Sequence, residues 1–328
     1  MDLKAVGKLV ALLLLLACTA CGPALATSAP PTLRAEASAP PNTATPPADP
    51  TATSAILPSS TPEAPLAALV NDQPIYLADY ERKLDQYEAD LPSQGIDPHS
   101  PEGQAKLAWA RAYILNVMIE QALTEQAAAA AGVVVSDADV DAYMQDMIAE
   151  NGGEEQFRAK LAERSETYED AWREVRAELI GMAMTQRIIE GVPTTAEHVH
   201  ARHILVDTAE EAERILGQLR AGAEFAALAR AYSQDPNTRA IGGDLDWFPR
   251  GILTAPEVEE AAFALPPGQF SEVVASSLGY HVVQVIERDP ARPVSQKNLL
   301  FLQDRALQEW IEGLWAQAVV QRFVETAP

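Results

Sequence analysis

Two histidines lie in short runs that have the alternation of β-strands. His203 is in A-R-H-I-L-V at 201–206, and His281 is in G-Y-H-V-V-Q-V at 279–285. In each run every second side chain shares a face, so His203 lies on the face of Leu205 and His281 on the face of Val283. Two strands of this kind can lie side by side in one sheet. Because imidazole titrates near neutral pH and is a common metal ligand, metal binding is the first chemistry to test against the pattern.

The histidine spacing disfavours a metal site. His198 and His200 share a strand face that His203 does not, and no cysteine or plainly placed carboxylate completes a ligand set. A solvated strand edge is the simpler interpretation of His198 and His200. Cys18 and Cys21 both lie at the end of the first apolar run, so we expect no disulfide, thiolate site or redox chemistry in the folded part.

The segment between the two histidines predicts a small α+β unit. Thr208 and Glu211 have capping-box spacing for a helix that ends at Gly222, and a second helix carries Phe225 and Tyr232. A strand at 245–248 follows a double glycine, and Pro256 begins a third helix. The expected order is strand, helix, helix, strand, helix, strand, strand, with the helices packed against one sheet.

Five motifs in this segment resemble the parvulin family of peptidyl-prolyl isomerases. They are A-R-H-I-L-V at 201, A-x-x-Y-S-x-D ending at 235, G-G-D-L-x-W-F at 242, E-E-A-A-F-A-L at 259 and G-Y-H-V-V at 279. They follow the family's order and nearly its spacing over about 90 residues, which is far more specific than one short motif. The resemblance implies the parvulin fold and rotation about X-Pro bonds, a reaction that needs no nucleophile, metal or cofactor.

The resemblance places the catalytic groups at His203, His281 and Asp235. It implies that the two histidines face each other across the central strands and that Asp235 acts electrostatically near the rotating carbonyl. A buried histidine pair that serves only the fold is the alternative for His203 and His281. For Asp235, which precedes Pro236 and Asn237, the alternative is a turn residue that caps its own backbone.

The resemblance places the substrate proline against Leu245, Phe248, Leu253, Val258 and Phe263. The chain departs from the family here: Val258 replaces an aromatic residue, one extra residue separates Leu253 from it, and Asp246 replaces a glycine. These departures keep open a second hypothesis, a holdase chaperone whose parvulin domain is weakly active or inactive and only binds peptide. The segment after Val206 is acidic, so recognition of phosphoserine-proline is not expected.

The flanking segments predict helices around this unit. The pattern V-N-x-x-P-I at 70–75 resembles the start of the amino-terminal domain of SurA and PrsA type chaperones, and helical apolar stripes follow up to about 192. These stripes favour core packing, with a ligand groove between the helices as the alternative. After a linker at 291–295, one long helix is expected over 296–324. The resemblance implies that this helix packs back on the amino-terminal helices, so that the isomerase is inserted in a split helical chaperone domain.

The first residues predict export and lipid attachment. Lys4 and Lys8 precede a short apolar run, and the L-L-A-C sequence ending at Cys18 resembles the bacterial lipobox, with Cys21 as the alternative site. Ordinary secretory cleavage after Ala17 or Ala20 is a further alternative. Residues 22–65 are rich in Pro, Ala, Thr and Ser and predict a disordered tether.

Together these features predict a bacterial lipoprotein foldase that acts outside the cytoplasm on unfolded exported chains containing X-Pro bonds. We expect a signal with lipobox at 1–21, a tether at 22–65, a helical chaperone domain at 66–195, a parvulin domain at 196–290 and a carboxy-terminal helix at 291–328. The formal charge of -23 argues against nucleic acid as a partner and against an electrostatic hold on an anionic membrane. The sequence leaves the oligomeric state open.

Overall fold

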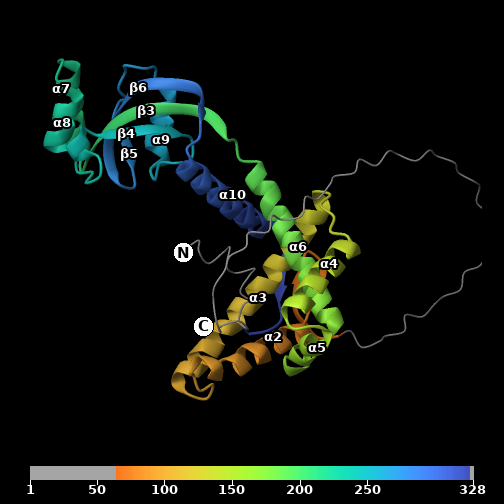
Figure 1. The fold of residues 1–328 in the computed structure, drawn as a ribbon. Helices are drawn as coiled ribbons and strands as arrows, with labels where there is room; N and C mark the ends of the chain where they lie inside the picture. Colours follow the sequence, from red (N-terminus) through yellow and green to blue (C-terminus); the bar gives the residue numbers. More distant parts are fainter. Residues whose placement is uncertain (1–63, 326–328) are drawn as a thin grey trace, which may run out of the picture.

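A computed structural model describes residues 64–325. The predicted export signal, Cys18, Cys21 and tether residues 22–63 lie outside this range. Within it the chain is α+β, as predicted, and forms the two lobes seen in Figure 1. The sheet-containing lobe, residues 195–293, is called the isomerase lobe after the activity that its motifs predict. It interrupts a mainly helical lobe formed by the segments before and after it. No helix in the described part of the chain combines the length and the apolar run needed to cross a bilayer.

The helical lobe begins with a β-hairpin and continues as five α-helices and one short 3₁₀ helix. Its elements are β1 (Leu66–Val70), β2 (Gln73–Tyr76), α2 (Leu77–Asp90), η1 (Pro92–Gln94), α3 (Pro101–Ala130), α4 (Asp137–Glu150), α5 (Glu154–Glu163) and α6 (Tyr168–Glu190). Side-chain caps begin three of these helices: the Ser100 hydroxyl accepts the Gly103 amide at the start of α3, and capping boxes pair Ser136 with Asp139 and Thr167 with Asp170. One apolar core lies between the hairpin, α2 and α3, and another between α4, α5 and α6. Most of the predicted stripes are therefore core faces.

The isomerase lobe is one antiparallel sheet with helices on both faces. Its elements are β3 (Thr195–Val206), α7 (Ala209–Arg220), α8 (Phe225–Tyr232), η2 (Arg239–Ile241), β4 (Asp244–Pro249), α9 (Pro256–Ala264), β5 (Val274–Ser276) and β6 (Gly279–Pro293). The strand order is β4-β3-β6-β5. One core lies between the sheet and α7 with α8, and the other lies between the sheet and α9. The predicted order of strands and helices is confirmed.

The capping box predicted at Thr208 is half formed. The Thr208 hydroxyl accepts a hydrogen bond from the Glu211 amide, as expected. The Glu211 carboxylate instead lies 3.5 Å from Arg214, one turn further along α7. The competing ion pair explains why the reciprocal bond to the cap is missing from this helix start.

The carboxy-terminal segment differs from the prediction at two places. The linker expected at 291–295 is wrong, because β6 extends to Pro293 and pairs with β3 as far as Thr195. The single helix expected over 296–324 is also wrong: α10 spans Gln296–Gln317, and β7 (Val320–Arg322) pairs antiparallel with β1. The hairpin leaves one edge of β1 unpaired, and β7 satisfies its backbone groups there.

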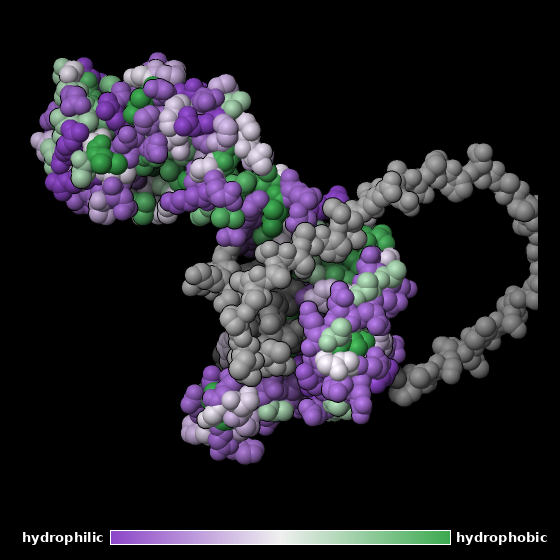
Figure 2. All heavy atoms as spheres, viewed as in Figure 1, coloured by the Kyte–Doolittle hydropathy of each residue, from purple (hydrophilic) through white to green (hydrophobic). Residues whose placement is uncertain are grey.

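Helix α10 joins the two lobes. Near its end Trp315 donates a hydrogen bond to Glu120 of α3, and Leu314 packs against the first core. The packing on amino-terminal helices is therefore as the resemblance implied. Figure 2 shows apolar surface where α10 leaves the isomerase lobe, and there Leu300 and Phe301 are exposed.

Candidate active site

The two predicted histidines meet on one face of the sheet. Strands β3 and β6 are neighbours, and their register places His281 opposite Leu205, two residues from His203. The Nδ1 atoms of the two rings lie 3.3 Å apart, and the ring planes are stacked at 22°. His203 is 7% exposed and His281 is 1% exposed. The pair is thus buried and hydrogen-bonded.

Asp235 lies at the other end of this pair. Its Oδ2 atom is 2.8 Å from His203 Nε2 and also accepts the Thr238 hydroxyl, while its Oδ1 atom accepts the Asn237 amide at 3.0 Å. The last bond is the turn cap that was the alternative interpretation of this residue. Asp235 therefore fixes its own turn and contacts the histidine with the same carboxylate.

Two hydroxyl residues complete the site and were missed from the sequence. Ser276 on β5 lies 2.8 Å from His281 Nε2 through its Oγ atom, and Thr238 lies 3.1 Å from His203 Nε2. The spacing of Asp235 and Thr238 is typical of a side-chain turn and was the available signal for Thr238. Ser276 had no such signal, because its contact depends on the pairing of β5 with β6.

The contacts form a continuous chain from Ser276 through His281 and His203 to Asp235. An ionised carboxylate only accepts hydrogen bonds, so His203 carries its proton on Nε2. With His203 neutral, His281 Nδ1–H then donates to His203 Nδ1, and Ser276 O–H donates to His281 Nε2. The tautomer of each ring is therefore set by its neighbour.

The surroundings hold the charges in a defined state. Burial raises the pKa of the Asp235 carboxyl, but hydrogen bonds from Thr238 and His203 outweigh burial and hold that pKa below its usual value. Burial, followed by the proximity of His203, lowers the pKa of His281 to about 4. At neutral pH this series of hydrogen-bonded side chains therefore has an anionic carboxylate at Asp235 and a neutral imidazole at His281.

Glycine is required at position 243, where the backbone packs against His203. Gly243 has φ +83°, and its carbonyl accepts the His203 amide at 2.8 Å. A Cβ atom on Gly243 would lie 2.1 Å from the His203 carbonyl oxygen, which backbone atoms do not allow. The second glycine of the G-G-D-L-x-W-F motif therefore helps to fix the position of His203.

The five residues predicted to hold the proline ring lie in one apolar cluster under α9. Phe248, Val258 and Phe263 are buried there, with Phe248 and Phe263 in an edge-to-face contact at 6.1 Å. Leu245 and Leu253 are half-buried and retain surface. The structure thus brings all five together and gives them two kinds of position, core and surface.

The solvated strand edge expected for His198 and His200 is wrong: β3 lies inside the sheet, His198 is buried and His200 is half-buried. His198 Nδ1 lies 2.9 Å from the Ala196 carbonyl, and His200 Nε2 lies 2.8 Å from Asp244, a carboxylate that the sequence pattern did not place. Across residues 64–325, no cluster of three or more His, Cys, Asp or Glu side chains is arranged to hold a metal ion.

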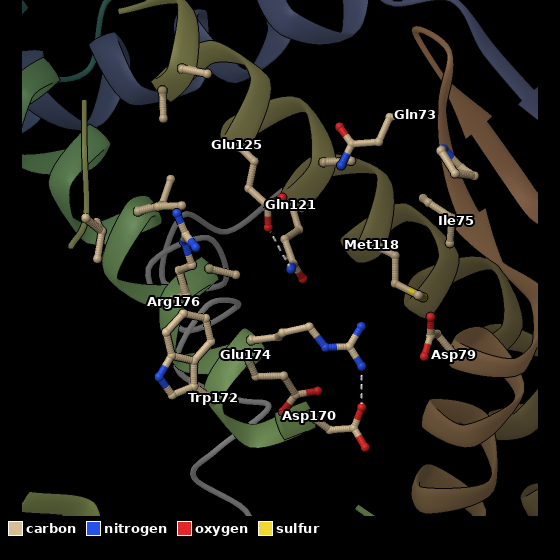
Figure 3. Close-up of a pocket in the computed structure, with 18 of the residues that line it drawn as sticks. Gln73, Ile75, Asp79, Met118, Gln121, Glu125, Asp170, Trp172, Glu174 and Arg176 are labelled. Carbon is tan, nitrogen blue, oxygen red and sulfur yellow. Dashed lines mark hydrogen bonds and ion pairs between the residues drawn. The ribbon is translucent and has the colours of Figure 1, made fainter. Parts of the chain in front are cut away.

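The helical lobe contains an open pocket between the hairpin, α3 and α6. It is a cavity of about 990 Å³. Figure 3 shows Met118 and Ile75 on one side and Trp172 on the other, with Gln121, Glu125 and Arg176 at polar positions. Its lining is mixed, unlike the apolar cluster under α9. The structure therefore contains a groove of the kind that was the alternative interpretation of the helical segment.

Comparison with known proteins supports both lobes. Residues 199–287 match the PPIC-type PPIASE domain, and residues 55–167 match the SurA-like N-terminal domain. The foldase protein PrsA of Caldanaerobacter subterraneus subsp. tengcongensis is 30% identical over 285 residues, which cover 79% of this chain and 88% of that protein. The chain belongs to the PrsA foldase family. Chaperone SurA of Bordetella parapertussis is 36% identical over 151 residues, 40% of this chain and 29% of that protein.

A solved structure is similar as well. The crystal structure of peptidylprolyl isomerase PrsA from Bacillus anthracis is 28% identical, covers 62% of this chain and 94% of that chain, and gives a TM-score of 0.40. By its family and its PPIC-type domain, this PrsA-type protein is a parvulin-type peptidyl-prolyl isomerase with chaperone function. The alternative of a holdase with a weakly active clamp is not favoured.

Proposed function

We propose that the protein rotates X-Pro bonds of unfolded exported polypeptides outside the cytoplasm, at a site made by Asp235, His203 and His281 beside the cluster under α9. The observation that carries this proposal is the buried chain of contacts from Ser276 to Asp235 on the sheet face that also holds the apolar cluster. An isomerase needs polar groups of fixed orientation next to an apolar seat for the proline ring, and this face offers both.

The reaction asks for little chemistry. The obstacle is the partial double bond of the X-Pro amide, with a rotation barrier of about 18–20 kcal/mol. A site accelerates rotation by binding the twisted amide more tightly than the planar one. In our proposal the anionic Asp235 disfavours the planar form, whose carbonyl oxygen carries extra negative charge, and the histidine pair shapes the polar floor. Leu245 and Leu253 contact the ring, and Phe248, Val258 and Phe263 support them from below.

Asp235→Asn tests this assignment. The substitution keeps the shape of the side chain and removes its charge, so we expect isomerisation of short unphosphorylated X-Pro peptides to fall by about tenfold or more. Asp207→Asn, the same change at an exposed position, is the matched control and should leave the rate unchanged. An Asp235→Asn protein with the wild-type rate would remove Asp235 from the catalytic groups.

We assign the chaperone part of the function to the cavity between the hairpin, α3 and α6. Unfolded chains present both apolar side chains and polar backbone, which suits its mixed walls. Val134 lines the cavity and is 77% exposed, so Val134→Asp changes the cavity without disturbing a core. We expect it to weaken suppression of client aggregation and to leave peptide isomerisation unchanged. Val319→Asp, at an exposed position away from the cavity, is the control.

The division into an isomerase domain inserted in a split helical domain is part of the same proposal, with the expected boundaries at 195/196 and 290/291 moved to 194/195 and 293/294 because β3 and β6 pair from Thr195 to Pro293. It is supported by cores that share no residue between the two lobes. We further propose that residues 1–21 direct export, that Cys18 carries the lipid and that 22–65 is a tether to the membrane. Cys18→Ala should abolish incorporation of labelled fatty acid, whereas Cys21→Ala should retain it; the reverse result would move the anchor to Cys21.

A further inference from the structure

The loop between β4 and α9 is organised around one buried carboxylate. The amides of Gly251, Ile252 and Leu253 all donate to Glu259: Gly251 to both carboxylate oxygens at 2.8 Å, Ile252 to Oε2 at 3.1 Å and Leu253 to Oε2 at 3.3 Å. Gly251 has φ +88°, which turns consecutive amides toward a common point. The loop thus forms an anion-binding nest of backbone amides, and the Glu259 carboxylate of the following helix, α9, occupies it.

Glu259 is unlike the other acidic residues of α9. It is 9% exposed, whereas Glu257 and Glu260 are exposed. A buried carboxylate is costly unless it is hydrogen-bonded, and here its partners are backbone amides of one loop. The residue also lies in the first turns of α9, where the helix dipole favours negative charge. These contacts fix the loop more firmly than its lack of regular structure suggests.

The loop carries part of the apolar site. Leu253 is half-buried in the same cluster as Val258, the residue just before Glu259. Two successive residues of α9 therefore support the same apolar cluster: Val258 packs in its core, and Glu259 holds the loop that carries Leu253.

Helix α10 holds the loop from outside. Arg305 donates to the Gly251 carbonyl at 3.0 Å, and Leu302 lies so close that a Cβ atom on Gly251 would be 2.9 Å from its Cδ2 atom. Glu259 therefore fixes the backbone N–H of Gly251, and Arg305 fixes its C=O in the next peptide unit. In this way a helix that packs on the helical lobe also contacts the rim of the isomerase site.

We propose that Glu259 is a positioning residue for the substrate proline: its carboxylate sets the Gly251–Leu253 loop so that Leu253 forms one wall of the proline seat, with Arg305 as the outer support. This inference rests on the proposed location of the active site. It predicts that loosening the loop weakens peptide binding and has little effect on the rotation of bound peptide, because the polar chain at Asp235 is untouched.

Glu259→Gln in the full 328-residue chain is the test, with Glu260→Gln as matched control. The amide nitrogen of glutamine cannot accept from Gly251, so the nest loses part of its hydrogen bonding. For a short unphosphorylated X-Pro peptide titrated by NMR, we expect the Kd to rise about threefold to tenfold while exchange of bound peptide stays within about twofold. The amide signals of Gly251, Ile252 and Leu253 should move in Glu259→Gln and stay in place in Glu260→Gln. A residue that only stabilised the fold would not separate Kd from bound-state exchange.

A wild-type Kd in folded Glu259→Gln, or an equal loss of binding and bound-state exchange, would overturn the inference. Should that variant fail to fold, Arg305→Gln replaces it, since Arg305 is exposed and loosens the loop from outside; it should raise Kd about twofold, and an unchanged Kd would be equally decisive. Absence of catalysis by the wild type would contradict the proposed function alone, because the Kd comparison is made on binding.

Discussion

Asp235 of the isomerase lobe differs from Glu166 and Glu178 of the helical lobe in how its charge is compensated. In the isomerase lobe, Asp235 is surrounded by donors, and its pKa is held below the usual value despite burial. In the helical lobe, burial and the nearby Glu174 raise the pKa of Glu166 and of Glu178. Within residues 64–325, no group hydrogen-bonds the buried Oε2 atom of Glu178. Asp170 in the helical lobe resembles Asp235: burial raises its pKa, but hydrogen bonds from Thr167 and Arg173 and the nearby Arg82 outweigh burial and lower it to about 2. The helical lobe therefore contains both a compensated carboxylate and two whose surroundings favour protonation.

The strongest way to break the isomerase lobe is at a glycine. Gly243→Ala should destabilise this lobe by about 3 kcal/mol or more, because the new methyl group would collide with the His203 carbonyl at positive φ. Gly217→Ala is the control: nothing lies within 4 Å of its Cβ position, and alanine is the better helix former, so we expect a gain of about 0.5–1 kcal/mol. Thermal unfolding of both variants checks this, and a mild effect at Gly243 would contradict the packing described.

Acid should affect these two kinds of carboxylate with opposite sign. The raised pKa values of Glu166 and Glu178 mean that these two groups hold protons more tightly in the folded helical lobe than in the unfolded chain, so their contribution to stability rises as pH falls toward their ordinary value of 4.5. The lowered pKa of Asp170, about 2, contributes stability to the same lobe that is lost at lower pH. The lowered pKa of Asp235 gives stability that is present above the unfolded value near 4 and is lost as pH falls through the folded value.

Thermal unfolding at several pH values, followed separately in each lobe by assigned NMR signals, measures the difference. Glu178→Gln removes one titrating group and should flatten the response of the helical lobe as pH falls from neutral toward 4.5. Glu163→Gln, at an exposed site, is the control. A response of the helical lobe that is unchanged in Glu178→Gln would show that another group causes it.

A smaller effect is expected where the chain departs from the family. Asp246 has φ +60°, a region that suits glycine, and is held by a hydrogen bond from its amide to Asp244 at 2.9 Å. Asp246→Gly should therefore stabilise the isomerase lobe by up to about 1 kcal/mol. Chemical denaturation measures this change. A loss of stability would mean that the Asp246 side chain contributes more than its backbone strain costs.

No change at all is expected for the charge of His281 near neutral pH. Since burial and the proximity of His203 lower its pKa to about 4, the ring should stay neutral down to about pH 5. Nitrogen chemical shifts of the imidazole report this directly. Protonation of His281 above about pH 6 would contradict the buried chain of contacts.

The sequence predicted the parts of the site that recur as motifs and missed those that depend on pairing. His203, His281 and Asp235 were identified because each lies in a run of several matching residues. Ser276 lies in none of the motifs, and Glu259 opens one of them, but both escaped notice because their contacts form only once strands and loops are in place. The strand β7 escaped for the same reason, because three residues form a strand only when the edge of β1 is free to receive them.

The central claim is that isomerisation and chaperone binding occupy different lobes, and one paired measurement tests it most directly. Peptide isomerisation and suppression of client aggregation are measured on Asp235→Asn and on Val134→Asp. We predict that Asp235→Asn loses the first activity and keeps the second, and that Val134→Asp does the reverse. Loss of both activities in either folded variant would contradict the separation and would place the client on both lobes at once.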